Sequence, residues 1–137
     1  MLARYFLSPG DIIIPPYTPL YQVEEQLIIN GYLVVKDEIR FFGLLTPNDV
    51  IQKAHNLVID CLTPKKTVAR DDEISTVIGL MREERQLFLP VLEEYGEYIG
   101  TVSYFRLIKE LKSLEKPSPM VTIQNIIGTK EQEENKQ

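Results

Sequence analysis

The chain has 137 residues, of which 44% are hydrophobic and 26% are charged, so it is long enough to bury the core of one domain. Its net charge of -5 argues against nucleic acid as a partner, because duplex binding depends on Lys and Arg that neutralise phosphates. Cys61 is the only cysteine, which excludes an intramolecular disulfide and favours the cytoplasm. No apolar run reaches the roughly 18 residues that a membrane span requires, so no membrane association is expected.

The first half of the chain predicts a strand, a helix, a hairpin and a second helix. Pro15 and Pro16 end the first strand, because proline cannot donate to a sheet ladder. Thr18 is a suitable N-cap for the first helix, and Gly31 supplies the left-handed residue that commonly ends one. The predicted elements are a strand over 11–14, a helix over 18–30, strands over 32–35 and 39–45 with a charged turn at 36–38, and a helix from Thr46 through Pro47.

The second half repeats this order. The predicted elements are a strand over 66–68, a helix over 72–84, strands over 88–92 and 98–102 with a turn at 93–97, and a helix over 104–114. Pro117 interrupts the last helix, and a tail follows it. The stretch 129–137 is polar, which is typical of disorder, whereas 120–127 could add an edge strand or dock on a partner.

The order of elements is matched by an internal sequence repeat. Pro9 and Pro64 lie 55 positions apart (64 − 9), and Gly43 and Gly100 lie 57 apart (100 − 43). The recurring sets are Phe6-Leu7-Ser8-Pro9 with Cys61-Leu62-Thr63-Pro64, Leu20, Val23 and Leu27 with Ile74, Val77 and Met81, and Gly43-Leu44-Leu45-Thr46 with Gly100-Thr101-Val102-Ser103. We therefore expect an α+β fold of two β-α-β-β-α units related by pseudo-twofold symmetry, with one unit over 1–57, a second over 58–114 and a tail over 115–137.

These residues resemble the tandem cystathionine β-synthase (CBS) domain, over roughly residues 6–114. The resemblance rests on the openings of the two repeats, Leu7-Ser8-Pro9 and Leu62-Thr63-Pro64, on Leu89-Pro90-Val91, and on the two strand-to-helix junctions. The junction pattern of the family is Gly, apolar, any, Ser or Thr, two free positions, then Asp, and it is matched by Gly43-Leu44-Leu45-Thr46-Pro47-Asn48-Asp49. It implies a CBS pair that binds an adenosine-containing ligand, such as AMP, ADP, ATP, S-adenosylmethionine or NAD, between the two copies. It also implies a homodimer.

The first junction permits two interpretations. A helix N-terminus with the Thr46 hydroxyl suits a phosphate, and the Asp49 carboxylate can accept hydrogen bonds from a ribose diol. Alternatively, Thr46 and Asp49 form a variant capping box, in which the carboxylate reaches back to the start of the helix.

The second junction departs from the family pattern, because Ser103 is followed by Arg106 where the aspartate would stand. A cation in a first helical turn opposes the helix dipole, so Arg106 requires a local reason. An exposed ion pair with a glutamate is one, and a ligand phosphate is another. We expect one competent ligand site.

The resemblance also implies an apolar slot for adenine near Ile12, Ile13, Tyr32 and Leu33. The Tyr32 ring could stack on a base. Alternatively, the three aliphatic residues are ordinary core and the tyrosine only packs.

The sequence lacks the parts of an enzyme. His55 is the only histidine, Cys61 has the surroundings of a small buried residue, and no glycine-rich phosphate loop occurs. Glu93, Glu94 and Glu97 form an acidic turn of the kind that is usually solvated, so no metal is expected. We predict a regulatory module without catalysis or a required cofactor, which senses an adenosine ligand and signals through its dimer or a separately encoded enzyme or transporter. The alternative is a ligand-free scaffold for dimerisation.

Overall fold

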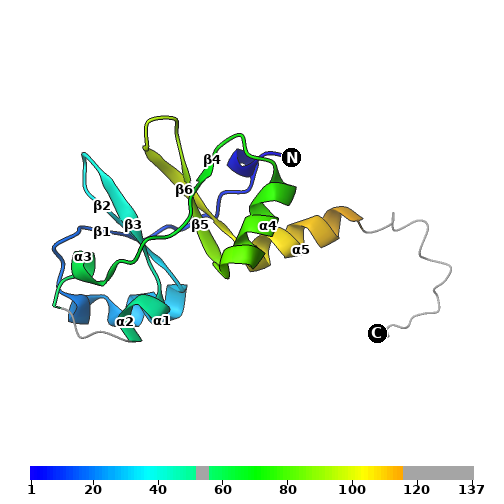
Figure 1. Cartoon of the computed structure of the whole chain (residues 1–137). Coiled ribbons are helices and arrows are strands. Elements are labelled where there is room, and N and C mark those ends of the chain that lie inside the picture. Colours follow the sequence, from blue (N-terminus) through cyan, green and yellow to red (C-terminus); the bar gives the residue numbers. More distant parts are fainter. Residues whose placement is uncertain (52–55, 116–137) are drawn as a thin grey trace, which may run out of the picture. The chain divides into compact units, whose positions relative to one another are not determined.

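The computed structural model describes residues 1–51 and 56–115 (Figure 1). The chain divides into two units, Met1–Leu107 and Ile108–Gln137, and the account below concerns the first unless it says otherwise. His55 and the predictions for 120–127 and 129–137 lie outside the described residues. Within the described residues, no helix has the length and apolar character needed to cross a membrane.

The first half forms one three-stranded sheet in the order β1-β2-β3. Strand β1 pairs parallel with β2, and β2 pairs antiparallel with β3. The elements of this half are the 3₁₀ helices η1 (Ala3–Tyr5) and η2 (Leu20–Gln22), strands β1 (Ile13–Ile14), β2 (Leu33–Lys36) and β3 (Phe41–Leu45), and helices α1 (Glu24–Asn30) and α2 (Pro47–Ile51).

The second half repeats the arrangement with a sheet in the order β4-β5-β6 and the same parallel and antiparallel pairings. Its elements are helices α3 (Val58–Cys61), α4 (Ile74–Glu84) and α5 (Tyr104–Glu115), and strands β4 (Val68–Ala69), β5 (Phe88–Leu92) and β6 (Tyr98–Ser103). The residues of α5 from Ile108 onward belong to the second unit. The α+β class and the two β-α-β-β-α units are confirmed.

The predicted helix start at Thr18 is wrong. The Thr18 hydroxyl donates to the Pro15 carbonyl at 2.8 Å, and Pro19 stays extended with ψ 135. The chain pairs here with a distant segment, because Leu20 N–H donates to the Asn56 carbonyl at 2.9 Å. This long-range pairing replaces the first helical turn with η2, and the α-helix begins only at Glu24. Its end at Gly31, with φ 88, is as predicted.

The strand boundaries also differ from the prediction in several places. Strand β3 begins at Phe41 because Asp37 closes a tight turn, in which its Oδ1 accepts from the Ile39 and Arg40 amides at 2.8 Å. Strand β1 spans only Ile13–Ile14, and β4 spans Val68–Ala69 rather than 66–68. The short helix α3 at the start of the second unit was not predicted.

The helical stripes recognised in the sequence are buried. Leu20, Val23 and Leu27 pack with Leu33, Val35 and Leu45 in the core of the first half. Ile74, Val77 and Met81 are likewise buried along α4. At roughly 25 cal/mol per Å² of apolar surface removed from water, side chains of this size contribute about 1.5 to 3 kcal/mol each when fully buried.

Each half begins with a segment, called its opening (residues 1–9 and 56–65), that forms hydrogen bonds with the other half. Ala3 N–H donates to the Asp72 carbonyl, as Val58 N–H does to Thr18, both at 2.9 Å. The two donors, Ala3 and Val58, are 55 positions apart (58 − 3), and the two acceptors, Thr18 and Asp72, are 54 apart (72 − 18). These separations are those of the sequence repeat. Further matching bonds join Arg4 to Arg70, Ile59 to Pro16, Ile74 to Met1 and Leu20 to Asn56. The opening of each repeat is therefore part of the wall of its neighbour, and this crossing sets the composition of the site.

Candidate functional site

A pocket of about 620 Å³ lies at the first strand-to-helix junction. This volume falls within the usual range of small-molecule sites, which is roughly 300 to 1,000 Å³. Its lining combines residues 46–49 of the junction, 63–65 of the second opening, 84–88 at the end of α4 and the start of β5, together with Gly31 and Phe105. The pocket is thus built from both repeats.

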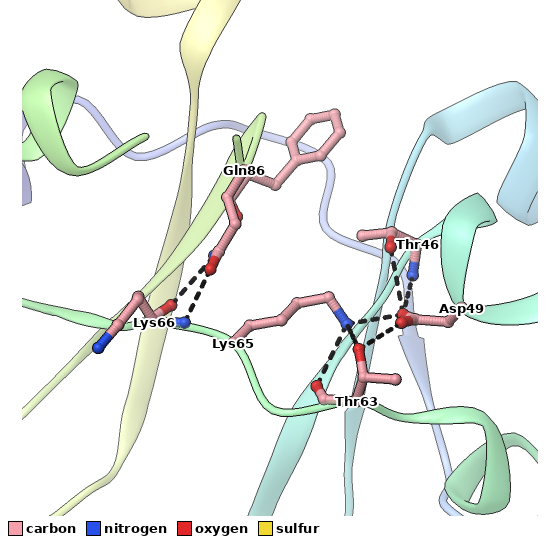
Figure 2. Close-up of polar contacts among 7 residues, drawn as sticks. Thr46, Asp49, Thr63, Lys65, Lys66 and Gln86 are labelled. Atoms are coloured by element: carbon pink, nitrogen blue, oxygen red, sulfur yellow. Dashed lines mark hydrogen bonds and ion pairs between the residues drawn. The ribbon is translucent and has the colours of Figure 1, made fainter. Parts of the chain in front are cut away.

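Asp49 is the most buried charged group of this pocket, with a side chain that is 3% exposed. Its Oδ2 accepts from the Thr46 amide at 2.8 Å and from the Thr46 hydroxyl at 3.1 Å. Its Oδ1 accepts from the Thr63 hydroxyl at 2.7 Å (Figure 2). The carboxylate therefore does reach back to the start of α2, as the capping-box interpretation predicts, and it also binds the opposite repeat.

Lys65 completes this cluster from the second opening. Its Nζ lies 2.7 Å from Asp49 Oδ2 and forms an ion pair, and its side chain is 15% exposed. The same ammonium donates to the Thr63 hydroxyl at 3.2 Å (Figure 2). A carboxylate and an ammonium so far out of water need each other, because an unpaired buried charge carries a large desolvation cost.

Gln86 holds the segment that carries Lys65. Its Oε1 accepts from the Lys66 amide at 2.9 Å, and its Nε2 donates to the Lys66 carbonyl at 3.3 Å (Figure 2). Nε2 also lies 3.5 Å from the Phe88 carbonyl at the start of β5. Both polar groups of the Lys66 backbone are thus satisfied by one side chain, which fixes the chain on either side of the pocket wall.

The pocket also has an apolar wall. It consists of Leu87, Phe88 and Phe105, all from the second repeat, and Phe105 is 67% exposed. Gly31 lies behind Phe88, and a Cβ at Gly31 would stand 3.1 Å from Phe88 Cζ. Only glycine fits this position without strain, because φ there is also 88.

Of the predicted site residues, the structure brings Thr46 and Asp49 together in the pocket. Ile12, Ile13, Tyr32 and Leu33 are not among the residues that line it. Leu33 is fully buried in the core of the first half, and Ile13 is 52% exposed. The apolar wall beside Asp49 comes from the second repeat because the two openings cross over.

Tyr32 is held in a different cluster. Its hydroxyl and that of Tyr98 donate to the two carboxylate oxygens of Asp11, and Tyr98 also contacts the Thr101 hydroxyl at 2.6 Å. Burial, followed by the hydrogen bond and charge of Asp11, raises the pKa of Tyr32 well above its usual range. The Tyr32 ring meets Phe88 with centroids 4.6 Å apart, so it supports the pocket wall from behind.

Ser103 and Arg106 lie where β6 meets α5, at the second junction. Neither is among the residues that line the Asp49 pocket. The repeat offset of 57 (106 − 49) makes Arg106 the counterpart of Asp49, and the offset of 55 (63 − 8) makes Ser8 the counterpart of Thr63. The Ser8 hydroxyl oxygen is buried and has no hydrogen-bond partner among the residues that the structure describes.

Sequence reasoning missed Thr63, Lys65, Gln86 and Phe88. The signal for Thr63 was present, because Leu62-Thr63-Pro64 was recognised as the opening of the second repeat. What was lacking was the rule that each opening packs on the other repeat. Leu62 packs at Gly43 of the first repeat, and a Cβ on that glycine would lie 3.7 Å from it.

Other chemistry-bearing residues do not gather at this site. In residues 1–51 and 56–115, no group of three or more His, Cys, Asp or Glu side chains is arranged to hold a metal ion. Cys61 is 1% exposed and its Sγ donates to the Leu57 carbonyl. Burial, with the nearby charges of Asp60, Asp49 and Glu24, raises the pKa of its thiol.

Comparison with known proteins finds a family match to part of the chain and several similar folds. Residues 58–113 match the family model described as the CBS domain. The fold is similar to that of CBSX2 in complex with AMP, at 18% identity and TM-score 0.73, covering 84% of this chain and 98% of that one. It is similar to the CBS domain pair of protein MJ0100 in complex with 5′-methylthioadenosine and S-adenosyl-L-methionine, at 18% identity and TM-score 0.72 over the same shares.

A third similar structure comes from a larger chain. It is the cytosolic domain of the Mg²⁺ channel MgtE in complex with ATP, at 23% identity and TM-score 0.63. The match covers 77% of this chain and 46% of that one. At such identities the three structures establish the fold that they share with this chain.

Proposed function

We propose that this chain, whose residues 58–113 are a CBS domain and whose fold is that of a CBS-domain pair, is a regulatory module that binds an adenosine-containing ligand at the Asp49 pocket. The observation that carries the proposal is a carboxylate 3% exposed at one end of a pocket of about 620 Å³. A carboxylate that lines such a pocket can accept hydrogen bonds from the two hydroxyls of a ribose when one of the donors that now bind it moves away.

The apolar wall of the pocket suits a base. Phe88 and Phe105 present aromatic surface there, on which a planar heterocycle can stack. The similar structures named above hold AMP, 5′-methylthioadenosine with S-adenosyl-L-methionine, or ATP, which supports an adenosine compound as the shared element. The candidate ligands are AMP, ADP, ATP, NAD and S-adenosylmethionine.

Signalling to a partner is the second part of this proposal. Ile28 and Ile29 are 75% and 78% exposed on α1, which supports a docking surface for a second copy or for a separately encoded enzyme or transporter. We place the protein in a reducing compartment such as the cytoplasm, since Cys61 is a buried free thiol.

A ligand-free interaction scaffold is the second candidate function, and one observation favours it. Both Asp49 oxygens already accept hydrogen bonds from groups within the chain, so the carboxylate has a structural role without any ligand. A scaffold would keep the cluster and bind no adenosine compound.

Calorimetric titration of the purified chain with AMP, ATP, NAD and S-adenosylmethionine decides between the two. We expect at least one to bind, and Asp49→Asn, which keeps the side-chain shape, to weaken it by about tenfold or more, equivalent to one charge-assisted hydrogen bond. Asp60→Asn, at an exposed aspartate outside the pocket, is the matched control and should bind as the wild type does. Absence of binding by all four compounds would leave the scaffold as the function.

A further inference from the structure

The charged side chains of the Asp49 pocket indicate which class of adenosine ligand it prefers, and they do so more narrowly than the volume of the pocket does. Its charged lining residues are Asp49, Lys65, Glu84 and Arg85, whose formal charges cancel. Glu84 and Arg85 are exposed at the end of α4, whereas the Lys65 side chain is 15% exposed and bound to Asp49. Lys65 is therefore the cation that the pocket holds closest to its recognition group.

The Asp49 carboxylate already accepts four hydrogen bonds in this arrangement. Its Oδ2 accepts from the Thr46 amide, the Thr46 hydroxyl and Lys65 Nζ, and its Oδ1 accepts from Thr63. Each carboxylate oxygen has about two acceptor sites, so Oδ1 keeps one open, and a sugar diol that donates two hydrogen bonds can bind only where one of these donors leaves. The Thr46 amide is fixed by the backbone, whereas Lys65 Nζ stands at the end of a flexible four-carbon stem.

We infer that Lys65 is a specificity-determining residue, which turns from Asp49 to an anionic group of the ligand when the sugar takes its place on the carboxylate. This inference rests on the proposed function and narrows it to phosphorylated adenosine compounds. The Lys65 ammonium can leave Asp49 only for another anion, because a mostly buried charge without a counterion carries a large desolvation cost. A ligand phosphate supplies that counterion.

Neutral and cationic ligands fail this exchange. Adenosine offers hydroxyls for Asp49 but no anion for Lys65, so its binding leaves the ammonium without a full partner. S-adenosylmethionine carries one carboxylate but also a sulfonium and an ammonium, so it brings a net positive charge to a lysine that is losing its counterion, and like charges at short range repel. The pocket therefore favours nucleotides over S-adenosylmethionine.

The test is the ratio of dissociation constants for adenosine and AMP, measured by calorimetry on the wild type and on Lys65→Met. We expect the wild type to bind AMP at least about tenfold more tightly, as one charge-assisted contact to phosphate would give. In Lys65→Met the ratio should fall to about threefold or less, and adenosine affinity should hold or rise because Lys65 no longer occupies an acceptor site of Asp49. Lys65→Arg, which keeps the charge, should retain the preference for AMP.

Lys66→Met is the matched control, because the neighbouring lysine side chain is exposed and does not line the pocket. It should leave the ratio at the wild-type value, which separates contact with phosphate from a general effect of net charge. Circular dichroism establishes that each variant is folded. If Lys65→Met does not fold, Lys65→Gln, which still offers Asp49 a donor, replaces it in the same comparison.

The outcomes separate this inference from the function beneath it. Binding of AMP with an unchanged ratio in folded Lys65→Met would overturn the role of Lys65 and leave the proposed function intact. Equal or tighter binding of S-adenosylmethionine than of AMP by the wild type would overturn the inference in the same way. If adenosine, the nucleotides and S-adenosylmethionine all fail to bind the wild type, the proposed function itself is wrong and this inference falls with it.

Discussion

Replacing Asp49 by alanine should destabilise the fold well beyond the loss of a helix cap. An N-cap is worth about 1 kcal/mol, whereas Asp49 accepts from the backbone, from two hydroxyls and from an ammonium. Removing one partner of a buried ion pair typically costs roughly 3 to 5 kcal/mol, because the other charge stays behind unpaired. Lys65 is 15% exposed and can partly reach water, so we expect about 2 to 3 kcal/mol.

Urea unfolding measures this loss directly, provided that the slope with denaturant stays constant across the variants. For a chain of this length the loss corresponds to a melting temperature lower by about 10 °C. The double variant Asp49→Ala with Lys65→Met should be more stable than Asp49→Ala alone, because it removes the stranded ammonium as well. This sign of coupling is the signature of a pair in contact.

A cost below about 0.5 kcal/mol for Asp49→Ala, with no coupling to Lys65, would refute the reasoning. It would mean that the two side chains do not pair in solution. The prediction also affects the choice of binding assay. A thermal shift on Asp49→Ala starts from a less stable protein, so direct affinities are the safer measure of ligand binding.

Two further predictions concern contacts between the repeats. A Cβ at Gly100 would stand 2.9 Å from Leu7, so Gly100→Ala should lower the free energy of unfolding, measured in urea, by about 1 to 3 kcal/mol. Gly79 lies on the exposed face of α4 with open space around it, so Gly79→Ala should raise that free energy by about 0.5 to 1 kcal/mol. Equal effects of the two substitutions would contradict the packing of Leu7 against Gly100. Burial and the hydrogen bond to Asp11 raise the pKa of Tyr98, so its proton is held more tightly in the folded state than in the unfolded one. Stability should therefore be constant up to about pH 9 and fall above the unfolded tyrosine pKa near 10, and Tyr98→Phe should fall less over that window. An equal fall in Tyr98→Phe would show that Tyr98 does not carry the effect.

Most of the fold follows from local sequence, and the misplaced start of the first helix has a cause that lies far along the chain. The stripes, hairpins and repeat order were visible because apolar periodicity reports burial within an element. The helix expected at Thr18 fails because Leu20 pairs with Asn56, far along the chain. Competition between a local helix start and a distant backbone partner is decided by tertiary structure, which a local pattern does not contain.

The site residues likewise divide into those that a local motif predicts and those that only the tertiary structure brings together. Thr46 and Asp49 could be predicted because they belong to one contiguous motif at one strand-to-helix junction. Lys65 and Phe88 could not, because they reach that junction only through the crossing of the two openings. The repeat offsets of 54, 55 and 57 identify equivalent positions in the two repeats, but they do not indicate that the opening of one repeat packs on the other.

The same crossing predicts how many ligands one chain should bind. The counterparts of Asp49, Thr63 and Lys65 at the second junction are Arg106, Ser8 and Gly10, from the offsets of 57 and 55 (106 − 49, 63 − 8, 65 − 10). The diol acceptor and its lysine counterion are thus both replaced, so the second junction does not carry the exchange that we infer at the first.

We therefore expect calorimetric titration with AMP to give a stoichiometry near one per chain. Asp49→Asn should weaken that single event without uncovering another, because the second junction offers no carboxylate at the matching position. A stoichiometry near two, or tight binding that survives Asp49→Asn, would show that a site built around Arg106 recognises the nucleotide by a different chemistry.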